Sequence, residues 1–493
     1  MPKHRKTLFY WLSLAFIAIA FYPLFAFLGT LPLRLWDESR LAASAYEMLH
    51  TNNPLIVTFS YLPDHWSVKP PFLIWVQAIS LKLFGVNEAA IRLPSALAIL
   101  FMGIILIYYS SKLKKPFLGF YAAVVIICSK GLLYYHCGRN ADYDAMLCFL
   151  IISYAIAFFV YLNNKEKKYY YLFFAFLILA TLTKGVQALI PLPFLLIYTL
   201  FQKEFISLIK NKATYWGIGS FVLVIGGYYF GRELFDPGYL KAVYENELGG
   251  RYLTPLEGHK GGKDFYYKEL KDGLFTYFFW LAPIAFVINL ITKDKVIRNL
   301  NIYSFGVAAF IFLIVTIGQT KLTWYAFPIV PFLAIPIGIS LYRLHLLINK
   351  IDNKLISSSL ILIAFISFFY TPYKEIVQHV TLPKEPEWAK PYYSRFDLIR
   401  QVIKGDLVYK EGFTMIQNDN YQDHLFYKYA MDEKGIKNQV VWVKHLRVGD
   451  IVLVNTPEID KEIFERFEYE CLYYHIQSKI IKLKQEKKKL IIN

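Results

Sequence analysis

The chain is poor in charged residues and in cysteine. Only 18% of its 493 residues are charged, whereas ordinary soluble domains reach about 25%. Its four cysteines contain no CxxC pair, and their spacing indicates no disulfide framework. Internal repeats, low-complexity linkers and a glycine-rich phosphate loop are also missing from the sequence. These absences argue against a disulfide scaffold and against a nucleotide held by such a loop.

Long apolar runs dominate what is present. Hydrophobic residues make up 56% of the chain and aromatic residues 18%, and the mean hydropathy is +0.36. Apolar runs of about 16 to 21 residues, the length that crosses a bilayer, recur from Leu8 to Tyr370. Soluble enzyme folds and disordered regulators are therefore excluded, and the sequence predicts a multi-spanning membrane protein.

The basic residues alternate along the chain in a way that predicts topology. The formal net charge is +17. Clusters of three Lys or Arg residues occupy the N-terminus and five later polar gaps, while the gaps between them hold one each, Arg139, Lys184 and Lys321. Because basic residues stay on the cytoplasmic side, the N-terminus is expected inside and the C-terminal part outside. The positive surplus is thus a topology signal, and no nucleic-acid partner is expected.

Eleven spans satisfy this alternation. They are expected near residues 8–28, 93–111, 116–136, 143–162, 168–183, 186–202, 214–231, 273–292, 302–318, 324–342 and 355–372. The predicted fold class is an all-α polytopic membrane protein of about 11–13 transmembrane helices, with external interfacial helices and a small C-terminal α/β domain. We expect the membrane domain to cover residues 1–371 and the C-terminal domain residues 372–493.

Two external segments, residues 29–92 and 231–272, are too long to be simple connections. Within the first, Phe72–Phe84 is apolar, follows two prolines and is too short to span, so it predicts a helix lying in the interface. Arg40–His50 is expected to form a second such helix. Helices at the level of the lipid headgroups suit a site that handles a lipid-linked substrate.

After about Pro372 the chain becomes polar. Alternation of apolar and polar residues predicts strands at Asp406–Ile416, Gln439–Val443 and Gly449–Val454, and the pattern of Asp423–Asp432 between them predicts a helix. The last stretch, Gln477–Asn493, alternates apolar residues with lysine. Together these patterns indicate a small α/β domain on the outer side.

Two motifs of the first external segment can carry chemistry. Trp36-Asp37-Glu38-Ser39-Arg40 places an acidic pair at the membrane boundary, where a carboxylate can act as a general base. The alternative is an ordinary helix start, since acids complement the dipole in a first turn. Lys69-Pro70-Pro71 places a compact cation at the start of the interfacial helix, where it can bind a lipid phosphate. Snorkelling of Lys69 to the headgroups explains it equally well.

Two short external turns add further candidates. Arg139-Asn140-Ala141-Asp142-Tyr143-Asp144 contains two aspartates, one of which is expected to cap the next span. Gln319-Thr320-Lys321-Leu322-Thr323-Trp324-Tyr325 joins a lysine to aromatic residues, a composition that an interfacial belt also produces. All four motifs lie on the same side under the predicted topology. An acid and several cations facing one leaflet are what transfer from a lipid phosphate requires.

The motifs resemble a superfamily of membrane glycosyltransferases. The resemblance begins with Trp36-Asp37-Glu38-Ser39-Arg40, Ser67-Val68-Lys69-Pro70-Pro71, Leu83-Phe84-Gly85-Val86-Asn87-Glu88 and Ala90-Ile91-Arg92-Leu93-Pro94. It continues through Arg139 to Asp144, Thr183-Lys184-Gly185, Glu245-Asn246 with Arg251, His259-Lys260-Gly261 with Phe265-Tyr266-Tyr267, and Thr320-Lys321-Leu322 with Tyr325. Members have the GT-C fold, include lipid A aminoarabinose transferases and protein O-mannosyltransferases, and take a sugar from a polyprenyl phosphate carrier. The resemblance covers roughly residues 5–345.

The resemblance implies a role for each matching residue. Asp37 corresponds to the expected general base, and Glu38 is a less suitable catalytic candidate because only one of two adjacent acids easily faces the same cavity. Arg40, Lys69 and Tyr325 correspond to contacts of the carrier phosphate. Asp144 corresponds to a second aspartate of the cavity. The further candidates for charge contacts are Arg139, expected as the partner of Asp144, and Lys184 and Lys321, expected near the phosphate or headgroup.

No metal is predicted from the Lys-Pro-Pro motif. Some relatives have an acidic residue immediately before it, where a metal can bind, whereas this chain has Val68. His259 remains a candidate ligand, so dependence on a divalent metal stays open. No other cofactor is expected.

The function that the resemblance implies is transfer of a sugar from an undecaprenyl-type phosphate carrier, by one inverting displacement, to a glycolipid such as lipid A, a polysaccharide or a protein. The expected place is the external, periplasmic face of a bacterial inner membrane, within the lipid bilayer. A polytopic transporter or flippase is the main alternative, but transporters more often show internal repeats or ionisable residues within the spans. An inert membrane scaffold whose tail recruits partners is a second alternative.

Overall fold

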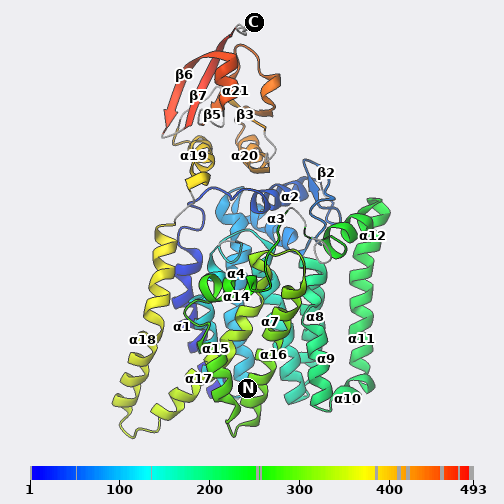
Figure 1. Ribbon diagram of the computed structural model, residues 1–493, viewed down its shortest axis with the longest axis vertical. Helices are drawn as coiled ribbons and strands as arrows, with labels where there is room; N and C mark the ends of the chain where they lie inside the picture. The colour runs from blue at the N-terminus through cyan, green and yellow to red at the C-terminus, as the bar shows by residue number, and fades with distance from the viewer. Residues whose placement is uncertain are drawn as a thin grey trace.

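The computed structural model describes residues 3–51, 53–134, 136–250, 255, 258–383, 387–407, 412–417, 422–455, 460–475 and 478–487. A bundle of helices forms the lower part of the molecule in Figure 1, and a small domain containing a sheet stands above it at the C-terminal end. The fold class expected from the sequence, a polytopic helical protein with a C-terminal α/β domain, is confirmed. Arg251 lies outside the described residues.

Seven helical segments of the described chain are long and apolar enough to cross a membrane. They contain α1 (Lys3–Phe25), α4 (Glu88–Lys112), α7 (Tyr143–Asn164), α8 (Lys167–Lys184) continuing into η1 (Gly185–Leu189), α16 (Lys295–Ile317), α17 (Ile329–Ile348) preceded by η5 (Thr323–Ala326), and α18 (Lys354–Thr381). Polar residues begin three of them, because the side chains of Asn87, Asp294 and Asn353 accept hydrogen bonds from the first free amides of α4, α16 and α18.

The other four predicted spans fall on shorter helices or on a helix with an irregular turn. The predicted span 116–136 is interrupted, since α5 (Pro116–Ile127) ends early and α6 (Lys130–Leu133) follows separately. Residues 186–202 and 273–292 contain α9 (Leu192–Phe201) and α15 (Leu281–Leu290). Residues 214–231 lie on α11 (Lys212–Phe221), the π-helical turn η2 (Val222–Gly226) and α12 (Gly227–Phe235), with α10 (Phe205–Lys210) before them.

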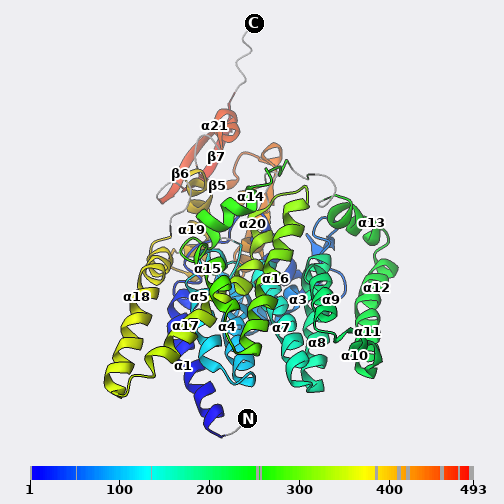
Figure 2. The same ribbon diagram turned by 60° about the horizontal axis from the view of Figure 1, so that its bottom comes forward.

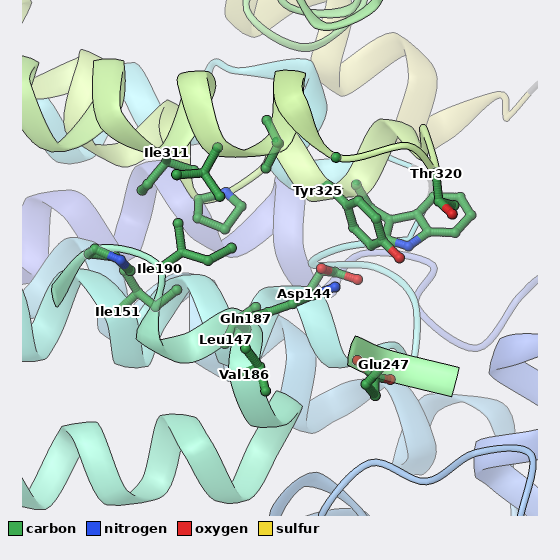
Figure 3. A pocket seen from close by; sticks show the side chains of 16 residues that line it. Asp144, Leu147, Ile151, Val186, Gln187, Ile190, Glu247, Ile311, Thr320 and Tyr325 are labelled. Atoms are coloured by element: carbon green, nitrogen blue, oxygen red, sulfur yellow. The ribbon is translucent and has the colours of Figure 1, made fainter. Parts of the chain in front are cut away.

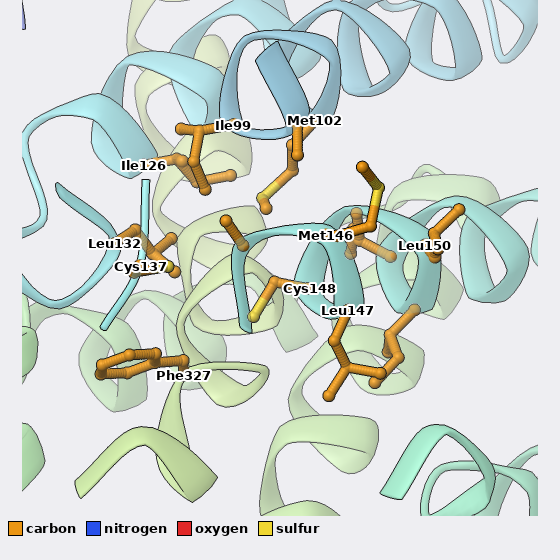
Figure 4. Packing of buried hydrophobic residues seen from close by; sticks show 14 of the residues in the cluster. Ile99, Met102, Ile126, Leu132, Cys137, Met146, Leu147, Cys148, Leu150 and Phe327 are labelled. Carbon is orange, nitrogen blue, oxygen red and sulfur yellow. The ribbon is translucent and has the colours of Figure 1, made fainter. Parts of the chain in front are cut away.

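The centre of the bundle is formed by α4, α5, α7 and α17, which pack against one another. The share of each span's most apolar stretch that is buried inside the protein differs widely. It is 94% for α7, but only 33% for α1 and 17% for α18. Small residues permit close approach, since a Cβ added at Gly338 of α17 would lie 2.8 Å from the backbone nitrogen of Ala122 in α5. Figure 4 shows part of this core, to which α4 contributes Met102, α5 Ile126 and α7 Cys148.

Two helices lie between the bundle and the C-terminal domain. They are α2 (Asp37–Thr51) and α3 (Phe72–Phe84), at the two places where interfacial helices were expected, and they pack on each other. A short hairpin of β1 (Thr58–Phe59) and β2 (Leu62–Pro63) joins them. The second long external segment holds α13 (Tyr239–Val243), η3 (Tyr244–Leu248), α14 (Phe265–Lys268) and η4 (Glu269–Leu274).

The C-terminal domain contains a five-stranded sheet in the order β4-β3-β5-β7-β6. Its strands are β3 (Phe413–Ile416), β4 (Asn438–Val441), β5 (Ile451–Val454), β6 (Phe467–His475) and β7 (Ser478–Glu486). The first three pair in parallel, and β7 runs antiparallel to both β5 and β6. The sequence patterns predicted strands at the places of β3, β4 and β5. The alternation noted in the last stretch falls on β7, although no strand was assigned there, and β6 was not located. The remaining elements are η6 (Glu387–Ala389), α19 (Lys390–Lys404), α20 (Gln422–Glu433), η7 (Val443–His445) and α21 (Lys461–Arg466).

Helix α20 rests on α2 and joins the two parts of the protein. The hydroxyl of Tyr429 donates a hydrogen bond to Glu47 of α2 at 2.7 Å, and the hydroxyl of Tyr427 donates to Glu88 of α4 at 2.9 Å. From α19, Arg400 donates to the backbone carbonyls of Gly29 and Thr30. Both parts of the protein are therefore fixed around the segment that carries Asp37 and Arg40.

Candidate functional site

A polar pocket lies where the start of α2, the loop before α7, the end of α8 and η5 meet. Its lining is Asp37, Arg40, Leu41, Ser67, Lys69, His136, Asp142, Tyr143, Asp144, Lys184, Gln187, Glu247, Trp324 and Tyr325. The structure therefore brings together six of the residues selected from the sequence, which are Asp37, Arg40, Lys69, Asp144, Lys184 and Tyr325. These residues come from segments almost 290 positions apart in the chain, so the bundle assembles the pocket.

The adjacent acids Asp37 and Glu38 face different surroundings. The side chain of Asp37 is 56% exposed and lines the polar pocket, with one carboxylate oxygen 4.0 Å from Nδ1 of His136. Glu38 is buried and is absent from the pocket lining. Its carboxylate accepts hydrogen bonds from Arg92 and from the backbone amides of Arg34 and Ala141.

Glu38 therefore anchors α2, and a catalytic role for Glu38 stays a prediction that this geometry does not favour. Burial opposes ionisation, but the charge and hydrogen bonds of Arg92 outweigh burial and lower the pKa of Glu38. A carboxylate with every oxygen engaged in this way is poorly placed to accept a proton from a substrate. Of the acidic pair, only Asp37 faces the pocket.

Arg40 and Lys69, the two cations of the first external segment that line the pocket, each have a carboxylate partner. Arg40 donates two hydrogen bonds to Asp64, at 2.9 and 2.7 Å, and its guanidinium lies over the ring of Phe59. Burial raises the pKa of Asp64, but the hydrogen bonds and charge of Arg40 outweigh burial and lower it overall. Nζ of Lys69 lies 3.8 Å from Oε1 of Glu247, a residue of η3. Each of the two cations is thus held in position by its carboxylate and still lines the pocket.

An ion pair between spans forms the floor of the pocket. Nζ of Lys184, at the end of α8, donates to Oδ1 of Asp144, at the start of α7, at 2.7 Å. Both side chains are buried, with 3% and 4% exposed. The same ammonium group lies 5.8 Å from the ring centre of Tyr325. Asp144 therefore pairs with Lys184, and the predicted pairing of Asp144 with Arg139 is wrong.

A histidine and two aspartates form a compact group in the pocket. Nδ1 of His136 lies 2.8 Å from Asp142, and its ring stacks on Trp324 at 3.9 Å between centres. Burial alone would lower the pKa of His136, but the charge of Asp142 and then of Asp37 raises it above its usual value. Asp37, His136 and Asp142 also offer ligand atoms within 4.8 Å of one another, a donor set that fits a divalent cation. His259 lies outside this group, on an exposed segment, and its carbonyl accepts a hydrogen bond from the amide of Lys321.

An apolar cavity of about 430 Å³ adjoins the polar pocket. The two share Asp144, Gln187, Glu247, Trp324 and Tyr325. Beyond these shared residues the cavity is lined mainly by aliphatic side chains of α7, of η1 with the residue after it, and of α16: Leu147, Ile151, Val186, Ile190, Ile311, Ile314 and Val315. Figure 3 shows Ile151, Ile190 and Ile311 at one end, with Asp144 and Tyr325 toward the other. The combined space therefore has a charged end and a long apolar end.

Two other candidates from the sequence stabilise helix ends and do not line this pocket. Arg139 donates to the carbonyls of Pro23, Leu24 and Ala26, where α1 ends. Lys321 donates to the carbonyls of Val315, Thr316 and Gly318, where α16 ends. Cations are favoured at these positions because the last carbonyls of a helix have no partners within it. Contact of Arg139 and Lys321 with the carrier stays a prediction, and the helix ends that they hold do not favour it.

The structure adds residues that the sequence patterns did not select. Asp142 was grouped with Asp144 as a helix cap, but its side chain makes no cap hydrogen bond and lies beside His136. His136, Asp64 and Glu247 lie in segments without a distinctive motif. Their only signal in the sequence was that each is an ionisable residue in a segment predicted at or beyond the external boundary.

Comparison with known proteins supports the resemblance. Residues 68–227 match the family "Dolichyl-phosphate-mannose-protein mannosyltransferase". An undecaprenyl phosphate-α-4-amino-4-deoxy-L-arabinose arabinosyl transferase of Aeromonas hydrophila is 26% identical over 321 residues, which is 63% of this chain and 57% of that protein. The protein of the same name from Wigglesworthia glossinidia brevipalpis is 32% identical over 171 residues, 33% of this chain and 30% of the relative. The chain thus matches little more than half the length of these relatives at most.

The fold likeness extends over nearly the whole chain. The structure of ArnT from Cupriavidus metallidurans bound to undecaprenyl phosphate matches with a TM-score of 0.67 at 15% identity, covering 95% of this chain and 97% of the other. The match includes residues beyond 345, where the sequence resemblance ended. The superfamily resemblance and the fold expected from it are confirmed, and the chain is a multi-pass membrane protein.

Proposed function

We propose that the chain, which has the fold of the GT-C membrane glycosyltransferases, transfers a sugar from a polyprenyl phosphate carrier to an acceptor. Arabinosyl transferases that are named for undecaprenyl phosphate are among the relatives that support this assignment. The comparisons do not favour the transporter alternative. The acceptor class is a glycolipid such as lipid A, a polysaccharide or a protein. The proposed site faces the periplasm of a bacterial inner membrane.

One observation carries the proposal. The polar pocket, with Arg40, Lys69 and Lys184, opens directly into an apolar cavity of about 430 Å³. A polyprenyl phosphate sugar has the same two-part chemistry, a long apolar chain ending in an anionic headgroup. Cations bind the phosphate and aliphatic walls bind the chain.

The proposed chemistry is a single displacement at the anomeric carbon. Asp37 accepts the proton of the attacking acceptor group, whose atom forms a bond to the anomeric carbon on the side opposite the phosphate. The bond between that carbon and the phosphate oxygen breaks, and its electron pair leaves with the polyprenyl phosphate. Arg40 and Lys69 stabilise the negative charge that grows on the departing phosphate, so the interaction is strongest in the transition state. Attack from the opposite side inverts the anomeric configuration.

The experiment measures sugar transfer directly. Purified protein in nanodiscs is incubated with undecaprenyl phosphates carrying different radiolabelled sugars, and bacterial envelope fractions serve as acceptors. We expect label in one acceptor fraction and at least a roughly 100-fold lower rate for Asp37→Asn, which keeps the shape of the side chain but loses its basicity. The matched control is Asp352→Asn, an exposed aspartate in the turn before α18.

Two outcomes would overturn the proposal. If no donor of the panel yields labelled acceptor while the protein moves labelled carrier across the bilayer, the transporter alternative replaces transfer. If transfer occurs equally in the wild type and in Asp37→Asn, the site is wrong although the activity is right.

A further inference from the structure

Residues 26–36, which we call the connecting segment, join the end of α1 to Asp37 at the start of α2. Within this segment, residues 32–34 belong to no helix, strand or turn. Trp36, directly before Asp37, has a φ of 66°, in the left-handed region that a bulky side chain rarely adopts. Such a conformation persists only where the surrounding structure holds it. The placement of Asp37 therefore depends on the contacts of the connecting segment.

The membrane domain holds the connecting segment through one arginine. Arg92 of α4 donates hydrogen bonds to three backbone carbonyls of the segment, those of Leu28, Leu31 and Pro32. The same guanidinium pairs with Glu38, the residue after Asp37, at 2.7 Å. These contacts tie the segment and the first turn of α2 to α4.

The C-terminal domain holds the same segment through two further side chains. In Figure 1 its helices α19 and α20 lie between its strands and the helices of the membrane domain, and Figure 2 shows the same order from another direction. Arg400 of α19 donates to the carbonyls of Gly29 and Thr30. The amide of Leu33 donates to the hydroxyl of Tyr427, in α20, at 2.9 Å. The connecting segment is thus held by both domains.

The hydroxyl of Tyr427 is engaged both as acceptor and as donor. It accepts from Leu33 and donates to Oε1 of Glu88, in α4, at 2.9 Å. Nε of Arg400 lies 2.8 Å from the same carboxylate oxygen. Tyr427 is only 1% exposed, and its ring stacks on Phe396 of α19. Without the hydroxyl, the amide of Leu33 would lose its acceptor in a buried place, which favours displacement of the segment.

We propose that Tyr427 is a positioning residue, which places the Asp37 carboxylate in the polar pocket by fixing the connecting segment. The inference rests on the proposed function, in which Asp37 accepts the proton of the acceptor group. A general base must lie within hydrogen-bond reach of that proton, and a misplacement of about 1 Å can lower a rate about 100-fold. The C-terminal domain thus acts on turnover without contributing a described residue to the polar pocket.

Binding of the carrier should not depend on Tyr427. Arg40 and Lys69 are held by Asp64 and Glu247, two carboxylates outside the connecting segment. Loss of the Tyr427 hydroxyl should therefore lower kcat and leave the Kd for undecaprenyl phosphate unchanged. A general loss of structure would change both quantities.

The test compares two phenylalanine variants of α20 in the full-length protein in nanodiscs. Tyr427→Phe keeps the ring against Phe396 and removes only the hydroxyl. Tyr429→Phe is the matched control, because it also removes a hydrogen bond to a buried carboxylate, that of Glu47 in the second half of α2. We expect both variants to lower the thermal midpoint. Only Tyr427→Phe should lower kcat for sugar transfer, by roughly 10- to 100-fold.

Two further measurements separate positioning from stability. Hydrogen exchange needs no sugar donor: peptides that cover the connecting segment should exchange faster in Tyr427→Phe than in the wild type, because the amide of Leu33 has lost its acceptor. The second measurement adds Tyr427→Phe to Asp37→Asn. If Tyr427 acts through Asp37, the added change should lower the residual rate no further.

Four results would overturn this inference alone. They are unchanged exchange of the connecting segment in Tyr427→Phe, an equal kcat for the two phenylalanine variants, a rise in Kd as large as the fall in kcat, and a loss of rate in Asp37→Asn as large as in the wild type. The last two would make the role of Tyr427 merely structural. A wild type that transfers no sugar from any donor would overturn the proposed function, and this inference with it.

Discussion

Replacing Lys184 by methionine should strongly destabilise the protein, because it leaves the Asp144 carboxylate buried without its partner. Nζ of Lys184 lies 2.7 Å from Asp144, and both side chains are at most 4% exposed. Removing one member of a buried ion pair costs about 3–5 kcal/mol, most of which is the penalty for the charge that remains. Replacing both members by neutral groups of similar volume is often close to neutral.

The double variant Asp144→Asn with Lys184→Met should therefore recover most of the lost stability. If each single variant costs about 3–5 kcal/mol and the double variant about 1 kcal/mol, the two sites should show a coupling energy of at least about 5 kcal/mol. The double variant should still be a poor transferase, since the cation beside Tyr325 is gone.

Thermal and denaturant unfolding in detergent, followed by intrinsic fluorescence, measures these differences. Lys167→Met is the matched control, because Lys167 begins the same helix but is exposed. The reasoning is refuted if Lys184→Met is as stable as the control, or if the double variant is less stable than both single variants together.

Three further predictions concern other parts of the site. Tyr429→Phe removes a hydrogen bond to the Glu47 carboxylate and should cost about 1.5–3 kcal/mol; limited proteolysis should then release the C-terminal domain sooner, and an unchanged cleavage rate would contradict that docking. Lys321→Met should lower the thermal midpoint, because the last carbonyls of α16 lose their donor, but should leave binding of undecaprenyl phosphate unchanged; a large rise in Kd would restore Lys321 to the carrier site. His136 has a raised pKa in the folded protein, so its stabilising charge is fully present below its unfolded pKa of about 6.5 and is lost as pH rises through the folded value. Wild type should lose stability over that range and His136→Gln should not; parallel stability curves would refute this.

The membrane fold was largely predictable from the sequence, because apolar length and basic-residue alternation are local properties. The helix Phe72–Phe84 was predicted with the bounds that it has, since two prolines and a glycine mark its ends. The interruption after Ile127 was not predictable from hydropathy, because Cys128 continues the apolar run of α5 and Leu132-Leu133 resume it. Strand β6 was missed because its exposed face and its glutamates obscure the alternation.

The candidate site was predictable where function depends on a motif and not where it depends on packing. Asp37, Arg40 and Lys69 carried their signal in adjacent residues, and all three line the pocket. Arg139 and Lys321 are cations too, but they donate hydrogen bonds to the last carbonyls of α1 and α16. These contacts depend on the three-dimensional packing of the helices and leave no local pattern in the sequence. The residues that hold these side chains in place lie elsewhere in the chain, where no sequence pattern located them. Asp64, for example, holds Arg40 and follows the β1–β2 hairpin, which was not predicted.

The most direct test of a carrier phosphate in the polar pocket is a titration of undecaprenyl phosphate into the purified protein in nanodiscs. Saturable binding is expected for the wild type and for Lys82→Ala, whose lysine is exposed near the end of α3. Arg40→Ala and Lys69→Ala should each weaken binding by at least roughly tenfold, since each removes a cation facing the phosphate. Binding with the same affinity in all four proteins, or no binding to the wild type, would contradict the placement of the phosphate between Arg40 and Lys69.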